Sequence, residues 1–297
     1  MTYYLPLLPW VVFVSIILCE SLRPAWLQSS CEVAVSDLKR WTGNILLFVS
    51  NHLMGRSASF LLLAFISREN IGPSLTEATT PIEAFGIVIG IVLLHDLVDY
   101  CKHIMLHRIP LLWRLHQIHH SDLKLDFSTS FRFHPVEVMI SFSIYLSLVI
   151  SLGIPDYALL VISVLSMING FFTHANTTIF NSIDRALQVI IVTPQMHQVH
   201  HSSDHNHFNS NFGVLFSFWD KLFGTYKTTS YNKTTDFEKT DYDQTGAAES
   251  ARDNQLSYGV KELKPWGDLN IFQMLALPFR RSVHRKPEAA KQATPLS

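Results

Sequence analysis

Charged side chains are scarce in this chain. They make up 16% of its 297 residues, against about a quarter in a typical soluble domain, and the mean hydropathy is +0.19. The formal net charge is −1, and no basic stripe with interleaved aromatic residues occurs, so the sequence predicts no nucleic-acid partner. Three scattered cysteines, Cys19, Cys31 and Cys101, are too few for a disulfide framework or a cysteine-based zinc site.

Two common metal-binding patterns are also missing. The chain has no HExxH sequence of the kind found in zinc proteases. It also has no Glu-x-x-His pair of the kind that holds carboxylate-bridged di-iron centres in helical bundles. A metal site in this chain would therefore have to use other ligands.

Long apolar runs, by contrast, fill much of the first 175 residues. They cover residues 3–19, 44–66, 82–94, 138–154 and 157–172. A membrane-spanning helix needs roughly 17 to 25 mostly apolar residues, so these runs lie near the lower limit. Five of them still favour an all-α, polytopic membrane protein, because a soluble protein would need several helices that are apolar all round.

The distribution of Lys and Arg predicts the orientation. Arg23, Lys39 and Arg40 follow the first apolar run, whereas the loop after the second run has only Arg68. The positive-inside rule then places the N-terminus outside and the histidine-rich segments in the cytoplasm. Residues 138–172 fit a tight helical hairpin that leaves this side and returns to it.

Twelve of the fifteen histidines lie in two windows, residues 95–134 and 197–207. His103 and His107 are four residues apart, so on a helix both rings lie on one face. Pro110 then ends or kinks that helix. Such clustering predicts a metal site.

Each window also contains an HxxHH box, a spacing that presents three imidazoles over a narrow arc of a helix. With the HxxxH pair and a histidine returned by the hairpin, nine candidate ligands result: His103, His107, His116, His119, His120, His174, His197, His200 and His201. Nine are too many for one zinc ion, which takes three or four protein ligands. They suit two metals, and imidazole suits Zn, Cu, Fe and Ni. We expect a histidine-rich di-iron centre that activates O₂.

At these boxes the chain resembles the fatty acid hydroxylase superfamily, which contains sterol desaturases, sterol C4-methyl oxidases and alkylglycerol monooxygenase. The matching stretches between about 85 and 226 are DLVDYCKH (96–103), HR (107–108), LWRLHQIHHS (112–121), RFHPVE (132–137), HAN (174–176), HQVHHS (197–202), NFG (211–213) and WDKLFGTY (219–226). The family usually has Trp in place of Cys101 and Arg in place of Ile104.

This resemblance implies about four transmembrane helices under a cytosolic helical cap that carries the di-iron centre. It implies that the nine histidines are the metal ligands. It also implies O₂-dependent hydroxylation or desaturation of a lipid such as a sterol or fatty acyl chain, with electrons from a separate reductase or small electron carrier.

Other residues are candidates to support the ligands without binding metal: His95, Asp99, His134, Asn176 and His205. Asp99 lies one helical turn before His103 and is placed to accept its imidazole N–H, as carboxylates behind metal-bound histidines do. The alternative for Asp99 is an ordinary ion pair with Lys102 or Arg108. His205 either lines the mouth of the site or faces solvent.

We divide the chain into N-terminal membrane helices (1–81), a di-iron domain (82–226) that contains the hairpin 138–172, and a polar tail (227–297) with an interfacial helix at 266–279. The expected location is the bacterial inner membrane or the endoplasmic reticulum. A membrane metal transporter or metal-storage protein is the alternative function, and an inactive family member that serves as a partner protein is a third. The lipid, the reaction outcome and the electron donor stay open.

Overall fold

The computed structural model describes residues 7–22, 37–66, 80–177, 181–228, 256–260, 263 and 269–280. Its helices are α1 (Leu8–Leu22), α2 (Asp37–Ile66), α3 (Pro81–Arg108), α4 (Pro110–His120), η2 (Phe127–Phe131), α5 (Pro135–Leu152), α6 (Asp156–Thr173), α7 (Asn181–Leu187), α8 (Pro194–His200), α9 (His205–Phe208), α10 (Phe218–Leu222), α12 (Ile271–Ala276) and η5 (Leu277–Phe279). Over these residues there are two isolated β-bridges and no strand. The all-α prediction is confirmed.

Among the described residues, three helices are long and apolar enough to cross a membrane: α3, α5 and α6. Helix α1 contains a shorter apolar stretch, Trp10–Glu20. Helix α3 begins at a capping box, in which Thr80 and Glu83 satisfy each other's backbone N–H groups, and it ends just before Pro110. The membrane character of the chain is confirmed, and the number of about four spans stays a prediction.

Helices α5 and α6 are joined by a short turn. Gly153 closes α5 with φ 59°, a left-handed conformation that glycine adopts without steric cost. Pro155 then precedes the first residue of α6. Helix α6 ends at Thr173, so His174 is its C-cap residue, and α6 runs back toward the end of the bundle where α5 began.

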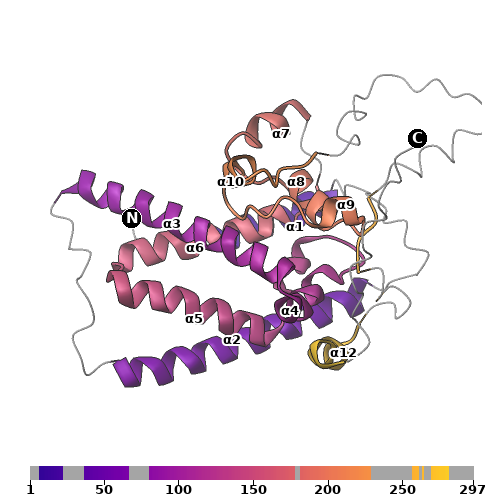
Figure 1. Cartoon of the computed structure of the whole chain (residues 1–297), viewed down its shortest axis with the longest axis horizontal. Helices are drawn as coiled ribbons and strands as arrows, with labels where there is room; N and C mark the ends of the chain where they lie inside the picture. The colour runs from indigo at the N-terminus through magenta and orange to yellow at the C-terminus, as the bar shows by residue number, and fades with distance from the viewer. Residues whose placement is uncertain are drawn as a thin grey trace, which may run out of the picture.

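The long helices lie side by side, and the short helices α7 to α10 gather at one end of them (Figure 1). Helix α3 packs on α6 through Ile91, Val92, Ala158 and Ile162, while α2 contacts α5. The C-terminal ends of α3 and α6 therefore lie at the end of the bundle where the short helices gather.

A buried ionic network fixes the loop between α4 and α5. Arg40 of α2 donates to Asp122 at 3.0 Å and also binds Asp126. Arg132 donates to Asn44 of α2 at 2.9 Å and to the Ile118 carbonyl at 2.9 Å. Buried charges are tolerated when they are paired and hydrogen-bonded, so this network constrains where α4 ends relative to α2.

The C-terminal segment packs back onto this end of the bundle. Met274 and Leu277 join Leu47 of α2 and Ile118 of α4 in one buried cluster. Of the helix expected at 266–279, the structure describes 269–279, where α12 covers six residues and a 3-10 turn follows because Pro278 cannot continue the helix. Phe272 on α12 stays 79% exposed, so the outer side of this helix is apolar.

Candidate metal centre

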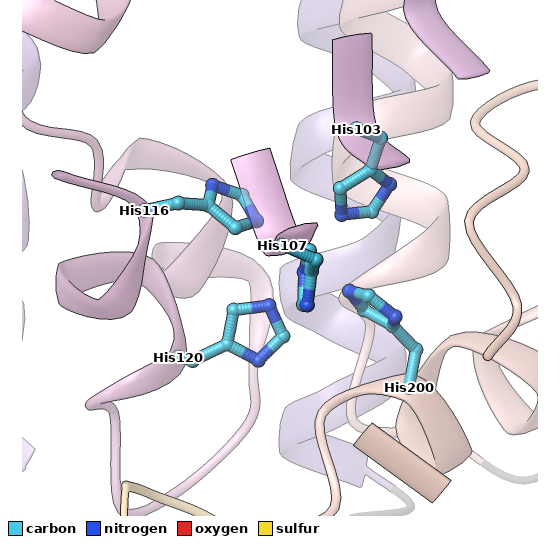
Figure 2. Close-up of side chains that lie close together, drawn as sticks. All are labelled: His103, His107, His116, His120 and His200. Atoms are coloured by element: carbon cyan, nitrogen blue, oxygen red, sulfur yellow. The ribbon is translucent and has the colours of Figure 1, made fainter. Parts of the chain in front are cut away.

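Five histidine rings converge at the junction of α3, α4 and α8. This first group consists of His103, His107, His116, His120 and His200. One ring nitrogen from each lies within 4.8 Å of those of the other four, and all five side chains are buried. Figure 2 shows the five rings pointing toward one common space.

Four more histidines form a second group beside the first: His119, His174, His197 and His201. Their Nε2 atoms face each other, at 3.2 Å for His119 and His174, 3.0 Å for His174 and His197, and 3.1 Å for His197 and His201. The structure therefore brings together all nine histidines that the sequence singles out, in two groups rather than one.

Each HxxHH box contributes to both groups. On α4, His116 and His120 are four residues apart and face the first group, while His119 faces the second. On α8 the division is reversed, since His197 and the following His201 face the second group and His200 faces the first. Residues i and i+4 share a helix face and i+3 lies to one side of it, so this spacing lets one helix serve two adjacent sites.

The outer nitrogen of several rings is held by an acceptor. Nδ1 of His103 donates to the Phe212 carbonyl at 2.9 Å, and Nδ1 of His200 donates to the Ser210 carbonyl at 2.8 Å. Nδ1 of His174 donates to the Gly170 carbonyl at 2.8 Å. A proton on Nδ1 leaves the Nε2 lone pair free, so these rings present a metal-binding nitrogen to the centre of their group.

Glu137 is the hydrogen-bond acceptor for the outer nitrogen of His116. His116 Nδ1 donates to Glu137 Oε1 at 2.8 Å, and both side chains are almost fully buried. The sequence pattern did not predict this role for Glu137. The signal available was a carboxylate in the first turn of the helix that begins at Pro135, close to the boxes in a chain with few acidic residues.

Burial favours the uncharged form of six of the nine imidazoles at neutral pH. Desolvation, followed by the neighbouring histidines, lowers the pKa of His119, His120, His197 and His201 well below the ordinary histidine value. Burial also lowers the pKa of His174 to about 4 and that of His200 to about 3. Neutral imidazole is the form that binds metal.

The donor set fits two metal ions. Nε2 of His103, His116 and His200 is buried and has no hydrogen-bond partner among the described residues, which is costly unless a cation binds there. In the second group the Nε2 atoms lie 3.0–3.2 Å apart. Nitrogens bound at about 2.1 Å to one ion are roughly 3.0–3.4 Å apart. An all-nitrogen set suits iron or zinc and excludes Mg²⁺ or Ca²⁺.

The supporting role expected for Asp99 is wrong. Asp99 accepts from Lys102 Nζ at 2.6 Å and from the Tyr145 hydroxyl, which is the ion-pair alternative. His103 uses the Phe212 carbonyl instead. His95 lies 3.3 Å from Asp99 and stacks on Tyr145, so it belongs to the same cluster and does not support a ligand.

His134 also does not contact a metal-ligand histidine, contrary to the expected supporting role. Its Nδ1 accepts the Val136 N–H as the N-cap of α5, and its Nε2 donates to the Leu275 carbonyl at 3.3 Å. Both nitrogens are thus used to anchor α5 and α12. Asn176 donates its backbone N–H to Glu20 at 2.7 Å. His205 begins α9, but its side chain lies outside the described part of the structure.

Asp220 holds the loop that supplies two of the supporting carbonyls. It accepts the backbone N–H groups of Phe212 and Gly213, both at 2.7 Å. A Cβ at Gly213 would lie 2.7 Å from Asp220 Oδ2 and 2.9 Å from the Phe216 carbonyl, so only glycine fits. This carboxylate therefore acts on His103 through the backbone.

A cavity of about 320 Å³ reaches both groups from between α3, α5 and α6. Its histidine lining is His103, His116, His119, His174 and His197. Phe133, Leu106 and Val138 contribute apolar walls. A ligand in this cavity would lie directly against both candidate metal positions.

Comparison with known proteins finds sequence similarity over the segment that carries the nine histidines. The sequence model of the fatty acid hydroxylase family matches residues 88–225. The chain is 30% identical over 153 residues to ornithine lipid hydroxylase OlsE of Rhizobium tropici, covering 52% of this chain and 45% of that protein. It is 30% identical over 128 residues to human alkylglycerol monooxygenase, covering 43% of this chain and 28% of that protein.

A third relative is human cholesterol 25-hydroxylase, 27% identical over 140 residues, which are 46% of this chain and 50% of that protein. The matches thus span half or less of the length of each of these three relatives. No solved structure matches the chain. Residues 88–225 of the chain are therefore similar to the fatty acid hydroxylase family.

Proposed function

We propose that this protein is a membrane-bound, O₂-dependent oxidoreductase that oxidises a C–H bond of a lipid, using two iron ions held by the nine histidines. The observation that carries the proposal is the convergence of nine buried histidines into two groups beside a cavity between membrane helices. Relatives whose names describe hydroxylation or oxygenation of lipids support the same reaction class.

The protein's own contribution is to hold the metal ions and to orient the histidine rings that bind them. The first group would bind one ion and the second group the other, and the bound ions would supply the O₂ and C–H chemistry. The carbonyls of Phe212, Ser210 and Gly170 and the carboxylate of Glu137 keep the Nδ1 protons away from the metal side. Preset ligand orientation of this kind raises metal affinity.

The cavity fits an apolar substrate that enters from the bilayer. It lies between α3, α5 and α6, the described helices that are long and apolar enough to span a membrane. Its walls combine apolar side chains with the histidines of both groups. A lipid chain lying there would place a carbon against the metal positions and exclude water from them.

The topology follows from the charge distribution. The positive-inside rule favours a multi-pass protein with the histidine boxes facing the cytoplasm, in a bacterial inner membrane or the endoplasmic reticulum. Electrons would come from a separate reductase or small carrier on that side. The division into membrane helices (1–81), a di-iron domain (82–226) and a tail (227–297) is part of this proposal.

The test is iron content and O₂ uptake of the purified full-length chain in lipid. We expect about two iron ions per chain, and O₂ uptake that needs both a reductant and a lipid extract. His119→Ala and His120→Ala should abolish uptake, whereas His52→Ala, which changes an exposed residue of α2, should not. Absence of iron, or metal flux into vesicles that is lost in His119→Ala, would contradict the proposal, and the flux would indicate a transporter.

A further inference from the structure

A cluster of polar and charged side chains lies between two of the membrane helices, beside the histidine groups but not part of either. Lys102 of α3 donates to Asp99 Oδ1 at 2.6 Å and to the Tyr145 hydroxyl of α5 at 2.7 Å. Asp99 also accepts from Tyr145 and lies 3.3 Å from His95 Nδ1. The His95 ring stacks on the Tyr145 ring at 4.5 Å.

Such a cluster is costly in this position. Charged groups inside a membrane bundle are expensive, and ionisable residues there usually mark a functional site. A buried ion pair is also no more stabilising than well-packed apolar side chains of similar size. Helix α3 already packs on α6 through an apolar cluster that includes Ile91 and Ile162. The ion pair contacts Tyr145 of α5 instead, and because a buried ion pair adds no stability over apolar packing, stability alone does not account for it.

The cluster lies at the junction of two cavities. One is the cavity of about 320 Å³ that reaches the histidines. The other, of about 420 Å³, extends along α3 away from them and is lined mainly by apolar side chains such as Leu94, Leu148 and Leu159. Asp99, Lys102 and Ser166 line both cavities. A long molecule that occupies both must pass the Lys102 ammonium.

The cavity of about 420 Å³, called the outer cavity from here on, is long enough for a hydrocarbon chain. Along α3 its lining runs from Lys102 back to Ile91, eleven positions earlier, which is about 16 Å of helix. The bound chain would then lie with its apolar part in the outer cavity. Its other part would extend past Lys102 to the histidines.

The Lys102 ammonium group determines which chemical groups of a ligand can bind beside it. Lysine carries three N–H donors, and Asp99 and Tyr145 accept two of them. The third can reach an oxygen of a ligand in either cavity. Because Asp99 already balances the positive charge, the matching acceptor is a neutral oxygen, such as a hydroxyl, ether or carbonyl, and a pure hydrocarbon would leave the donor unpaired.

We propose that Lys102 is a specificity-determining residue that selects lipids carrying a neutral oxygen group, held at the junction of the two cavities. This inference rests on the proposed function and names the substrate class for the same site. The lipid's hydrocarbon portion fills the outer cavity, and Lys102 sets which carbon lies against the metal centre.

The test compares two photoreactive probes of matched length, a diazirine analogue of monopalmitoylglycerol and one of hexadecane. The iron-loaded full chain is placed in phosphatidylcholine vesicles, and labelling of the α5 and α6 peptides is measured by mass spectrometry. We expect the wild type to favour the glycerol lipid. Asp99→Asn combined with Lys102→Met removes both charges together and should lower this preference about tenfold, the value of one hydrogen bond to a charged group.

Two matched variants separate recognition from packing. Lys102→Arg keeps a cationic donor and should keep most of the preference. Lys124→Met removes an exposed lysine that pairs with Asp37 at 2.8 Å and should leave the preference unchanged. A purely structural ion pair would change the melting temperature in the double variant but not the ratio of the two probes.

A measurement on the wild type guards against a variant that fails to fold. Monopalmitoylglycerol should slow the labelling of Lys102 by an amine reagent relative to Lys124, and hexadecane should not. An unchanged probe ratio in the folded double variant, or equal protection by both lipids, overturns the proposal. Iron content is measured in the same samples, so a wild type without iron contradicts the proposed function while the probe data still decide the role of Lys102.

Discussion

Glu137 accepts the Nδ1 proton of His116 at 2.8 Å, although 21 residues and the loop that Arg40 anchors separate them. The carboxylate fixes which nitrogen of His116 faces the first group. Glu137→Gln can still accept this proton but loses the negative charge that makes the imidazole a stronger ligand. We expect iron affinity or activity to fall about 10- to 100-fold.

Iron binding by equilibrium dialysis, together with turnover, checks this expectation. Glu83→Gln is the control, because Glu83 caps the start of α3 far from the histidines along that helix. Equal iron affinity in Glu137→Gln and wild type would show that the hydrogen bond has no effect on the ligand.

The division of each box between two groups predicts different losses from neighbouring residues. His120→Ala removes a ligand of the first group and His119→Ala removes one of the second. Each should lower bound iron to about one ion per chain, and the remaining ion should have a different Mössbauer spectrum in the two variants. Identical spectra would mean that the two groups do not hold separate ions.

The lowered pKa values predict how the metal-free protein responds to acid. His174, with a pKa of about 4, and His200, with a pKa of about 3, stay neutral in the fold, whereas in the unfolded chain they take up protons near the ordinary value of about 6.5. The unfolded state then binds more protons below that value, so stability falls as the pH falls.

We therefore expect the melting temperature of the metal-free protein to drop between about pH 7 and pH 5. The iron-loaded protein should resist this change until protons displace the metal, because bound metal excludes protons from the same nitrogens. Thermal unfolding of both forms across this range measures the difference. A metal-free protein that gains stability on acidification would contradict the assignment of neutral histidines.

Gly213→Ala tests the loop behind His103. The new Cβ would lie 2.7 Å from Asp220 Oδ2, so the Phe212 carbonyl must shift. We expect a loss of about 1–3 kcal/mol in stability, as for other overpacked sites, and weaker iron binding. Gly86→Ala on α3 meets open space and should be neutral or slightly stabilising. Thermal unfolding and iron content distinguish the two variants.

Much of the centre could be predicted from local spacing. Helical periodicity alone places His103 beside His107 and His116 beside His120, and the apolar runs predict the hairpin that returns His174. The separation into two groups depends on how α4 and α8 face each other, which no local pattern encodes. That is why the sequence predicted two metals only from the number of ligands.

The supporting contacts were harder to predict for the same reason. Asp99 has the right spacing from His103, but the partner of that ring is the Phe212 carbonyl, 109 residues further along the chain. His134 lies in the right window, yet its ring binds α5 and α12. Backbone carbonyls carry no residue-type signal, so sequence reasoning favours a nearby carboxylate over them.

The sharing of α4 and α8 between both groups couples the two binding events. The first ion bound would order both helices, and the second would find its ligands already in place. Iron uptake should then be cooperative, with few singly loaded molecules at half-saturation, because the entropy of ordering these helices is lost only once. A box that serves one ion alone would give two independent uptake steps.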